Sequence, residues 1–434
     1  MRILVLAPQW PDPARQGAAI RNLQILLHLA QRHEVYLLTF ASDGPMEMER
    51  LQRVCKLAEA LPHPTRSSAL RLQQLATTRL PDMAWRLHST EMLERVTALC
   101  QEVPFDAVHI EGIEMATYGL LAARFRIEDM GLWTEEARPG GFSGYSAQLR
   151  KLETPTPGLT YDAHNAEYVL QRRAFTTDMA DAARLPYALY SLVQWWRLRR
   201  FERRVCIASK HVLAVSDADR KALALRAPDK AAAMRVLPNG VDTDYWSRDA
   251  AFPPANIPRG VEALVFDGTM DFRPNVDAVV WFVKNVLPLV RADRQQVRFY
   301  IVGRNPSPEV ASLAETPGVT VTGAVPDTRG WVARASVYVV PMRMGGGVRL
   351  KVLQAMSMGC AIVSTPMGAE GIYLRPNKDM LLARTPIDFA LNILTLLNNP
   401  DQRLDLGTSA RERALDRYTW DKLLPTLDEI YPLA

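Results

Sequence analysis

The sequence has little cysteine and no long apolar run at its start, and each absence excludes a class of protein. The four cysteines lie at positions 55, 100, 206 and 360. They form no CxxC pair and match no zinc spacing, which predicts buried thiols in a reducing compartment. The longest apolar run near the start covers residues 3–7, which is too short for a signal peptide or a membrane span. It predicts a first buried strand and a cytoplasmic location.

Motifs for metals, nicotinamide cofactors and nucleic acid are also missing. The sequence has no HxH, HExxH or EF-hand pattern and no strand followed by GxGxxG, which disfavours a metal site and a dehydrogenase. One DxD, Asp242-Thr243-Asp244, lies in a proline-rich linker away from any predicted strand end, so we expect no metal there. The net charge of +5 and the pI of about 9.0 favour anionic ligands such as nucleotide diphosphates, lipid phosphates or a membrane face. No recognition motif for nucleic acid accompanies this charge.

The hydrophobic pattern predicts two α/β domains, because 434 residues exceed what one core normally holds. A strand at 2–7, an amphipathic helix at 20–31 and a strand at 33–40 form a βαβ unit, which implies a parallel sheet. Further strands are expected at 107–110, 159–162, 212–215, 263–266, 298–302, 319–322, 337–341 and 361–364, with a helix at 275–290 and a long helical stretch at 402–431. The proline-rich linker divides the chain into residues 1–239 and 240–414. We therefore expect two Rossmann-like doubly wound domains facing a cleft, where ligands bind.

The most informative segment, residues 338–365, reads YVVPMRMGGGVRLKVLQAMSMGCAIVST. A strand ends before Gly345, Gly346 and Gly347, and a helix is predicted from 348 to about 358. Glycines allow the backbone to approach a ligand, and the free N–H groups at the helix start favour a phosphate. Arg349 and Lys351 add positive charge, and Gln354 lies on the same helix side as Lys351. The pattern predicts a site that neutralises a leaving diphosphate without a metal; the alternative is a tight turn with a solvated basic edge.

These residues resemble the donor-binding motif of retaining glycosyltransferases of family 4, also described as glycosyl transferases group 1, which have the GT-B fold. The branch in question typically reads GGGxRLKxLEAMAxGxPVVST. The resemblance extends over nearly the whole chain: PNGVDTDYW at 238–246, DGTMDFRPNVDAV at 267–279, YDAHNAEYVLQRR at 161–173 and the final YTW at 418–420 match other segments of the family. It implies that residues 1–239 form the acceptor-side domain, that 415–434 cross back onto it, and that 240–414 bind the nucleotide-sugar donor.

Two departures from the family pattern affect the donor site. Many members have two glutamates separated by seven residues, at positions that here hold Gly346 and Gln354; the second glutamate accepts hydrogen bonds from ribose hydroxyls in the family. Gln keeps one carbonyl acceptor but lacks the charge. Many members also carry an arginine and a lysine where this chain has Thr269 and Pro274. Arg349 and Lys351 are then expected to hold the diphosphate, with Gly268 and Arg273 contributing to the donor loop.

Three further segments carry candidate residues. The resemblance places His164 beside the donor sugar, although a lone histidine is more often a structural residue; Glu167, Arg172 and Arg173 near it support the site or form a solvated helix face. Gly17 and Arg21, after the first strand, are candidates for holding the acceptor or a donor phosphate, and the alternative is a plain loop-to-helix turn. The helix from Trp195 to Arg204, WWRLRRFERR, either contacts an anionic membrane surface or packs its tryptophans in the core.

The expected activity is transfer of a sugar from a nucleotide-diphosphate donor to an acceptor hydroxyl of a glycan or lipid-linked acceptor, with retention, in polysaccharide or glycolipid biosynthesis. His164, Arg349 and Lys351 are the expected catalytic residues. No cofactor is expected, since the nucleotide-diphosphate sugar is a co-substrate, and the enzyme is expected in the cytoplasm or at the inner face of the membrane. A sugar-nucleotide epimerase would need carboxylates that the sequence does not place. A non-catalytic binding or scaffold protein of a polysaccharide-export system stays open, and Gln354 favours it.

Overall fold

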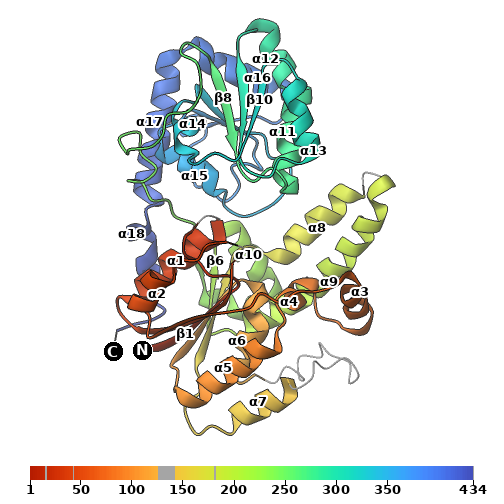
Figure 1. Ribbon diagram of the computed structural model, residues 1–434, viewed down its shortest axis with the longest axis vertical. Coiled ribbons are helices and arrows are strands. Elements are labelled where there is room, and N and C mark those ends of the chain that lie inside the picture. The colour runs from red at the N-terminus through yellow and green to blue at the C-terminus, as the bar shows by residue number, and fades with distance from the viewer. Residues whose placement is uncertain (15–16, 43, 126–141, 180–181, 434) are drawn as a thin grey trace. The chain divides into compact units, whose positions relative to one another are not determined.

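The computed structural model describes residues 1–14, 17–42, 44–125, 142–179 and 182–433 (Figure 1). The chain divides into two compact units: unit 1 comprises Met1–Leu237 and Leu424–Ala434, and unit 2 comprises Pro238–Leu423. The sequence placed the first boundary after residue 239 and the return to the first domain at residue 415. In the structure the chain changes unit after Leu237 and after Leu423.

Unit 1 is built on a parallel sheet of seven strands in the described residues. The strands, in the spatial order β3-β2-β1-β4-β5-β6-β7, are β3 (Leu57–Leu61), β2 (Glu34–Phe40), β1 (Arg2–Ala7), β4 (Ala107–Glu111), β5 (Gly158–Ala163), β6 (His211–Ala214) and β7 (Met234–Val236). β1 and β4 are almost wholly buried, as expected for central strands covered on both faces. The predicted strands at 2–7, 33–40, 107–110, 159–162 and 212–215 are confirmed.

The helices of unit 1 connect these strands. They are α1 (Gly17–Ala30), α2 (Met48–Val54), α3 (Ser68–Thr77), α4 (Asp82–Arg86), α5 (Thr90–Glu102), α6 (Ala116–Ala122), α7 (Phe142–Arg150), α8 (Glu167–Asp178), α9 (Leu185–Ala208) and α10 (Asp217–Arg226). α8 and α9 pack against each other and extend away from the sheet of unit 1 (Figure 1). Ser216 caps α10 by accepting a hydrogen bond from the Asp219 N–H, as its sequence predicts.

Unit 2 is a second parallel sheet, of six strands in the described residues. In the order β10-β9-β8-β11-β12-β13 these are β10 (Val319–Gly323), β9 (Arg298–Val302), β8 (Ala263–Asp267), β11 (Val337–Val340), β12 (Ile362–Ser364) and β13 (Leu381–Leu382). Every predicted strand of this half is present. The chain order reverses between β8 and β11, and in an open α/β sheet the crevice at the carboxyl ends of two such strands is where ligands bind.

The helices of unit 2 lie on both sides of its sheet (Figure 1). They are α11 (Arg273–Asn285), α12 (Leu287–Asp293), α13 (Pro308–Ala311), α14 (Arg329–Ala333), α15 (Leu350–Ser357), α16 (Pro386–Asn398), α17 (Pro400–Arg417) and α18 (Trp420–Leu423). The predicted helix 275–290 is wrong in its continuity, because a Leu-Pro step follows Val286 and divides it into α11 and α12. The predicted stretch 402–431 likewise ends at Arg417 and resumes only as short turns.

The structure bears on two expectations, one about the cysteines and one about membrane spans. All four cysteines are free and buried, and desolvation raises the pKa of the Cys55 thiol to about 11, as expected for inert core thiols. Among the described residues, no helix combines the length and apolarity that a membrane crossing requires.

Candidate active site

The candidate donor site lies in unit 2, where two loops follow neighbouring strands. The loop after β8 begins at Gly268, and the loop after β11 contains the three glycines. The two loops lie close together: a Cβ added to Gly345 would lie 3.8 Å from the Cβ of Pro274, which follows the first loop. Gly345 and Gly347 have φ values of 104° and 71°, which only glycine adopts without strain. Glycine at these positions therefore permits the loop conformation and also leaves space beside the backbone.

Lys351 connects the two loops. Its Nζ donates to the carbonyl of Asp267 at the end of β8 and to Asn275 Oδ1 at 3.1 Å, and it lies 3.9 Å from the centre of the Phe266 ring. The pKa of Lys351 is lowered to about 8, mainly by desolvation; the charge of Asp267 opposes this shift and the charge of Arg349 adds to it. An ammonium that is desolvated and held on neutral carbonyl and amide oxygens favours an anion beside it.

Close approach explains why Gly268 follows β8. A Cβ at this position would lie 2.6 Å from Lys351 Nζ and 2.8 Å from Asn275 Nδ2, and the φ of Gly268 is 153°. Asn275 in turn donates to the Thr269 carbonyl at 2.9 Å, so its amide links the loop to Lys351. Asn275 was not singled out by the sequence, since nothing in a lone asparagine at a helix start separates it from an ordinary turn residue.

Arg349 and Gln354 flank Lys351. The predicted helix start at 348 is wrong: α15 begins at Leu350, and Arg349 is its N-cap residue. The Arg349 guanidinium donates to the carbonyls of Gly346 and Gly347, the latter at 3.0 Å, which orders the glycine segment. Gln354 and Lys351 are both partly exposed on α15, in agreement with a shared helix side. The Gly359 residue after the helix has a φ of 64°, the left-handed conformation that is typical of a glycine at a helix C-terminus.

Arg273 is exposed at the first position of α11. Arg273 therefore puts a cation where the loop between β8 and α11 ends. The structure brings together Gly268, Lys351 and the glycine segment, with Arg273 following the loop that begins at Gly268. These are the residues that the sequence assigned to one donor site.

Unit 1 carries a second group of polar side chains at the ends of β4 and β5. The strand register pairs Glu111 with Asp162, so both carboxylates lie at the carboxyl edge of the sheet. His164 follows β5, and its Nε2 lies 2.9 Å from Glu111 Oε2. Burial raises the pKa of Glu111, but hydrogen bonds from His109 and His164 outweigh it and hold that pKa well below its ordinary value. Burial lowers the pKa of His164, and the Glu111 hydrogen bond and the Asp162 charge more than offset this, so the net pKa is raised.

Arg21 pairs with the buried Asp162. Its Nε and Nη2 lie 2.8 Å from the two carboxylate oxygens, and Nη1 donates to the Leu237 carbonyl at 2.8 Å. The Arg21 side chain is 1% exposed. A guanidinium with these partners links the end of β5 to the chain after β7, whereas the sequence suggested a phosphate or acceptor clamp. Gly17, the first residue of α1, is exposed.

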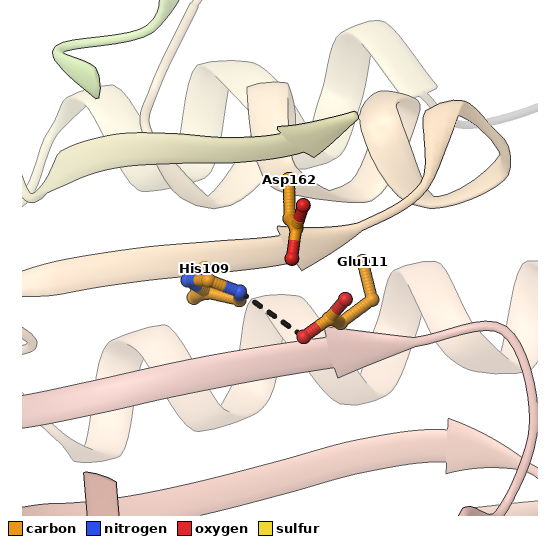
Figure 2. A group of neighbouring side chains, drawn as sticks. All are labelled: His109, Glu111 and Asp162. Atoms are coloured by element: carbon orange, nitrogen blue, oxygen red, sulfur yellow. Dashed lines mark hydrogen bonds and ion pairs between the residues drawn. The ribbon is translucent and has the colours of Figure 1, made fainter. Parts of the chain in front are cut away.

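Figure 2 shows His109, Glu111 and Asp162, whose potential ligand atoms lie within 4.8 Å of one another. This combination of one histidine and two carboxylates is typical of metal-binding sites. However, His109 Nε2 lies 3.1 Å from Glu111 Oε1, and both Asp162 oxygens are taken by Arg21. The geometry therefore fits a closed hydrogen-bond network. The DxD is likewise engaged, since Asp242 Oδ1 accepts from the backbone N–H groups of Asp244 and Tyr245 at 3.1 and 2.9 Å.

Glu111 is the residue that sequence reasoning missed in unit 1. The only available signal was a charged residue ending a buried strand, HIEG, directly before a glycine. Glu167, in contrast, is a candidate that the sequence indicates. It is hydrogen-bonded by Asn165 at 3.0 Å, and desolvation raises its pKa to about 7, helped by the charge of Glu114. Arg172 lies 5.9 Å from the centre of the Trp195 ring, which is a packing role.

The segment from Trp195 to Arg204 lies in α9. Trp195 is partly buried and stacks with Phe175 at a ring-centre distance of 6.5 Å. Trp196 is 47% exposed and Arg200 lies 3.2 Å from its ring centre. The two tryptophans thus face different surroundings, one in the helix pair and one in solvent.

Comparison with known proteins agrees with this geometry. Residues 262–399 match the family model described as Glycosyl transferases group 1, which covers most of unit 2 and contains the glycine segment and Lys351. An uncharacterized 44.6 kDa protein in the cps region of Klebsiella pneumoniae is 20% identical over 172 residues, which are 38% of this chain and 44% of that protein. The chain therefore aligns with less than half the length of this relative.

Solved structures extend the likeness to both units. HepE of Anabaena in complex with UDP has a TM-score of 0.63 at 13% identity, covering 99% of each chain. The sucrose-phosphate synthase of Thermosynechococcus elongatus has a TM-score of 0.66 at 18% identity, covering 99% of this chain and 98% of that one. WaaG, a glycosyltransferase involved in lipopolysaccharide biosynthesis, has a TM-score of 0.62 at 14% identity over the full length of both chains. The fold is that of the GT-B glycosyltransferases.

Proposed function

We propose that the protein is a glycosyltransferase that moves a sugar from a nucleotide-diphosphate donor to an acceptor hydroxyl, with retention and without a metal ion. The observation that carries the proposal is the cradle of Lys351, Asn275 and Gly268 beside the glycine segment, inside a group 1 glycosyltransferase domain. The neighbouring structures of HepE with UDP and with UDP-glucose make uridine donors the first to test. No cofactor beyond the donor is part of the proposal.

In the proposed reaction the bond between the anomeric carbon and the diphosphate breaks, and the acceptor oxygen bonds to the same face of that carbon. The acceptor proton passes to the departing diphosphate. The Lys351 ammonium and the first-turn N–H groups of α15 stabilise the negative charge that develops on this leaving group, while Arg349 holds the glycine segment in shape. His164 is assigned to a sugar hydroxyl, which it orients through its ring nitrogen.

The acceptor class is a glycan or a lipid-linked glycan, and the biosynthetic role is in polysaccharide or glycolipid production. The relative in the Klebsiella cps region and the likeness to WaaG support this part of the proposal. A peripheral membrane contact is supported by α9, in which Leu185, Leu189, Val193 and Trp196 are exposed at helical spacing and arginines follow at 199, 200, 203 and 204. Co-sedimentation with phosphatidylglycerol vesicles, but not with phosphatidylcholine vesicles, should occur for the native chain and weaken in Trp196→Ala.

The decisive experiment is a thermal-shift screen of the full chain with UDP-, GDP- and ADP-linked sugars, with and without EDTA. We expect one donor class to raise the melting temperature, EDTA to have no effect, and Lys351→Ala to abolish the shift. Lys378→Ala is the matched control, since this lysine lies in the same unit on the β12–β13 connection. No shift with any donor would contradict the proposal, and a shift that EDTA removes would contradict its metal independence.

A second candidate is a sugar-nucleotide-binding or scaffold protein of a polysaccharide-export system. Gln354 favours it, because glutamine replaces the charged acceptor that the family resemblance leads one to expect. One assay distinguishes the two candidate functions. Radiolabelled donor bound by a glycosyltransferase is turned over, by transfer or by slow hydrolysis, whereas donor bound by a scaffold protein is recovered intact.

A further inference from the structure

The C-terminal segment of the chain enters the hydrogen-bond network of unit 1. Tyr431 is 2% exposed, and its hydroxyl lies 2.8 Å from His109 Nδ1. His109 is on β4, and its Nε2 lies 3.1 Å from Glu111 Oε1. Glu111 Oε2 then lies 2.9 Å from Nε2 of His164. A continuous chain of hydrogen bonds therefore connects residue 431 to the residue that the proposed function assigns to the sugar.

The directions of these hydrogen bonds are fixed by chemistry. Glu111 is an ionised carboxylate and can only accept, so both imidazoles must donate Nε2–H to it. In the Nε2–H tautomer His109 has a lone pair on Nδ1 that accepts a hydrogen bond from the Tyr431 hydroxyl, and a hydrogen bond with Thr160 engages the same hydroxyl. Asn22, with its amide turned to donate, adds a third hydrogen bond to Glu111 at 3.0 Å.

This arrangement also determines which atom of His164 meets a ligand. With Nε2–H committed to Glu111, Nδ1 is the remaining ring nitrogen. The side chain of His164 is 20% exposed, and Nδ1 would lie 3.6 Å from a Cβ added to Gly112. Gly112 has a φ of 81°, and the absence of its side chain keeps the space beside Nδ1 open.

We propose that Tyr431, His109 and Glu111 are positioning residues that fix His164 with Nε2–H donated inward and Nδ1 presented to the sugar. This proposal rests on the proposed function for the identity of the ligand, but the geometry of the histidine does not depend on it. The C-terminal segment is thereby a part of the site in unit 1: it completes the network that sets the tautomer of His164.

The charged groups around His164 come from four elements. Glu111 ends β4, Asp162 lies on β5, Arg21 on α1, and Glu167 on α8. Glu111 and Asp162 favour the imidazolium form of His164, and Arg21 opposes it. A change at Glu111 alone therefore tests the network while the Asp162–Arg21 pair and Glu167 stay in place.

The test is nitrogen NMR of the full chain with ring-labelled histidine, with His109→Asn and His164→Asn for assignment. In the native chain we expect both histidines as Nε2–H tautomers at alkaline pH. His109 and His164 bond different oxygens of Glu111, and Glu111→Gln keeps only one of these as an oxygen, so one of the two imidazoles loses its acceptor. We expect the pKa of His164 to fall by about 1–3 pH units and its tautomers to mix.

Tyr431→Phe keeps the ring and removes only the hydroxyl. We expect mixed tautomers at His109 and a measurable change in the His164 signals, whereas the control Tyr36→Phe, on β2 of the same sheet, should change neither. Native signals of His164 in Glu111→Gln, or in Tyr431→Phe, would overturn the proposal. The NMR measurement needs no donor. A negative NMR result would therefore contradict only the positioning role, whereas the absence of a donor thermal shift would contradict the proposed function.

Discussion

Donor binding should weaken as the pH rises from 7 to 9, because the ammonium of Lys351 is the main desolvated cation of the donor cradle. Its Nζ is held by the Asp267 carbonyl and Asn275, and desolvation lowers its pKa to about 8. A diphosphate beside it restores the charge balance and raises that pKa again. Binding and protonation are therefore linked, and the ligand takes up protons through this lysine.

The magnitude follows from the fraction of Lys351 that carries a proton. With a pKa of about 8, roughly nine tenths of the free protein is protonated at pH 7 and about one tenth at pH 9, which predicts a loss of affinity of about tenfold. The unliganded protein should respond in the opposite direction. Its folded pKa lies below the ordinary lysine value, so the unfolded state binds the proton more tightly and the unliganded protein gains stability as the pH rises from 8 towards 10.5.

Calorimetric titration with UDP-glucose suits this test, because its diphosphate does not titrate in the range used. Near pH 8, titrations in two buffers of different ionisation enthalpy should reveal uptake of about half a proton per ligand. Lys351→Met should bind weakly at every pH and should melt at or above the native temperature without ligand, since it removes a desolvated ammonium. An affinity that stays constant from pH 7 to 9 in the native chain would refute the reasoning.

Other predictions concern the supports of the two sites. Gly268→Ala places a Cβ 2.6 Å from Lys351 Nζ; we expect the donor thermal shift to disappear with a loss of unfolding free energy of about 1–3 kcal/mol, measured by urea titration. Arg21→Leu leaves Asp162 buried without its partner and should cost about 3–5 kcal/mol, with Asp162→Asn in the same background recovering part of it, as a double-mutant cycle would measure. His164 has a raised pKa, so its stabilising charge is present below about pH 6.5 and is lost as the pH rises through the folded pKa; the stability difference from His164→Asn should be larger near pH 6 than near pH 8.

Much of the fold could be predicted from the sequence because parallel strands that are buried on both faces consist of continuous apolar runs. Residues 263–267, ALVFD, form the buried strand β8, and the sequence predicted a strand at 263–266. The ends of helices and strands were harder to predict. The sequence continued one helix from 275 to 290, while the chain breaks it at Val286, since the effect of one proline depends on how the flanking turns pack.

The candidate site was predictable where its chemistry is local. The glycine segment, Arg349 and Lys351 lie within seven consecutive residues, so their spacing alone indicated an anion site. The network in unit 1 is different, because Tyr431 and His109 are 322 positions apart. Arg21 shows the same limit: its sequence position after the first strand suggested a ligand contact, and only the fold reveals that Asp162, 141 positions away, takes its guanidinium.

Gln354 offers a test of how strongly the nucleotide is held. It is partly exposed on α15, one turn beyond Lys351, so under the proposed function its side chain would extend along the donor from the diphosphate. Gln354→Glu replaces a neutral acceptor with a charged one. Hydrogen bonds to charged groups exceed neutral ones by about 1 kcal/mol, which predicts about fivefold tighter binding of UDP-glucose by titration calorimetry.

The same variant separates the two candidate functions. In an enzyme that already transfers sugar, Gln354→Glu should lower the KM for the donor with little change in kcat, because ribose contacts are made equally in the ground state and the transition state. If the native chain binds donor without turnover and the variant begins to hydrolyse it, Gln354 is what holds the native protein in a binding role. A variant that binds more weakly than the native chain would show that Gln354 does not face the ribose at all, and the carry-over of this position from the family pattern would have to be abandoned.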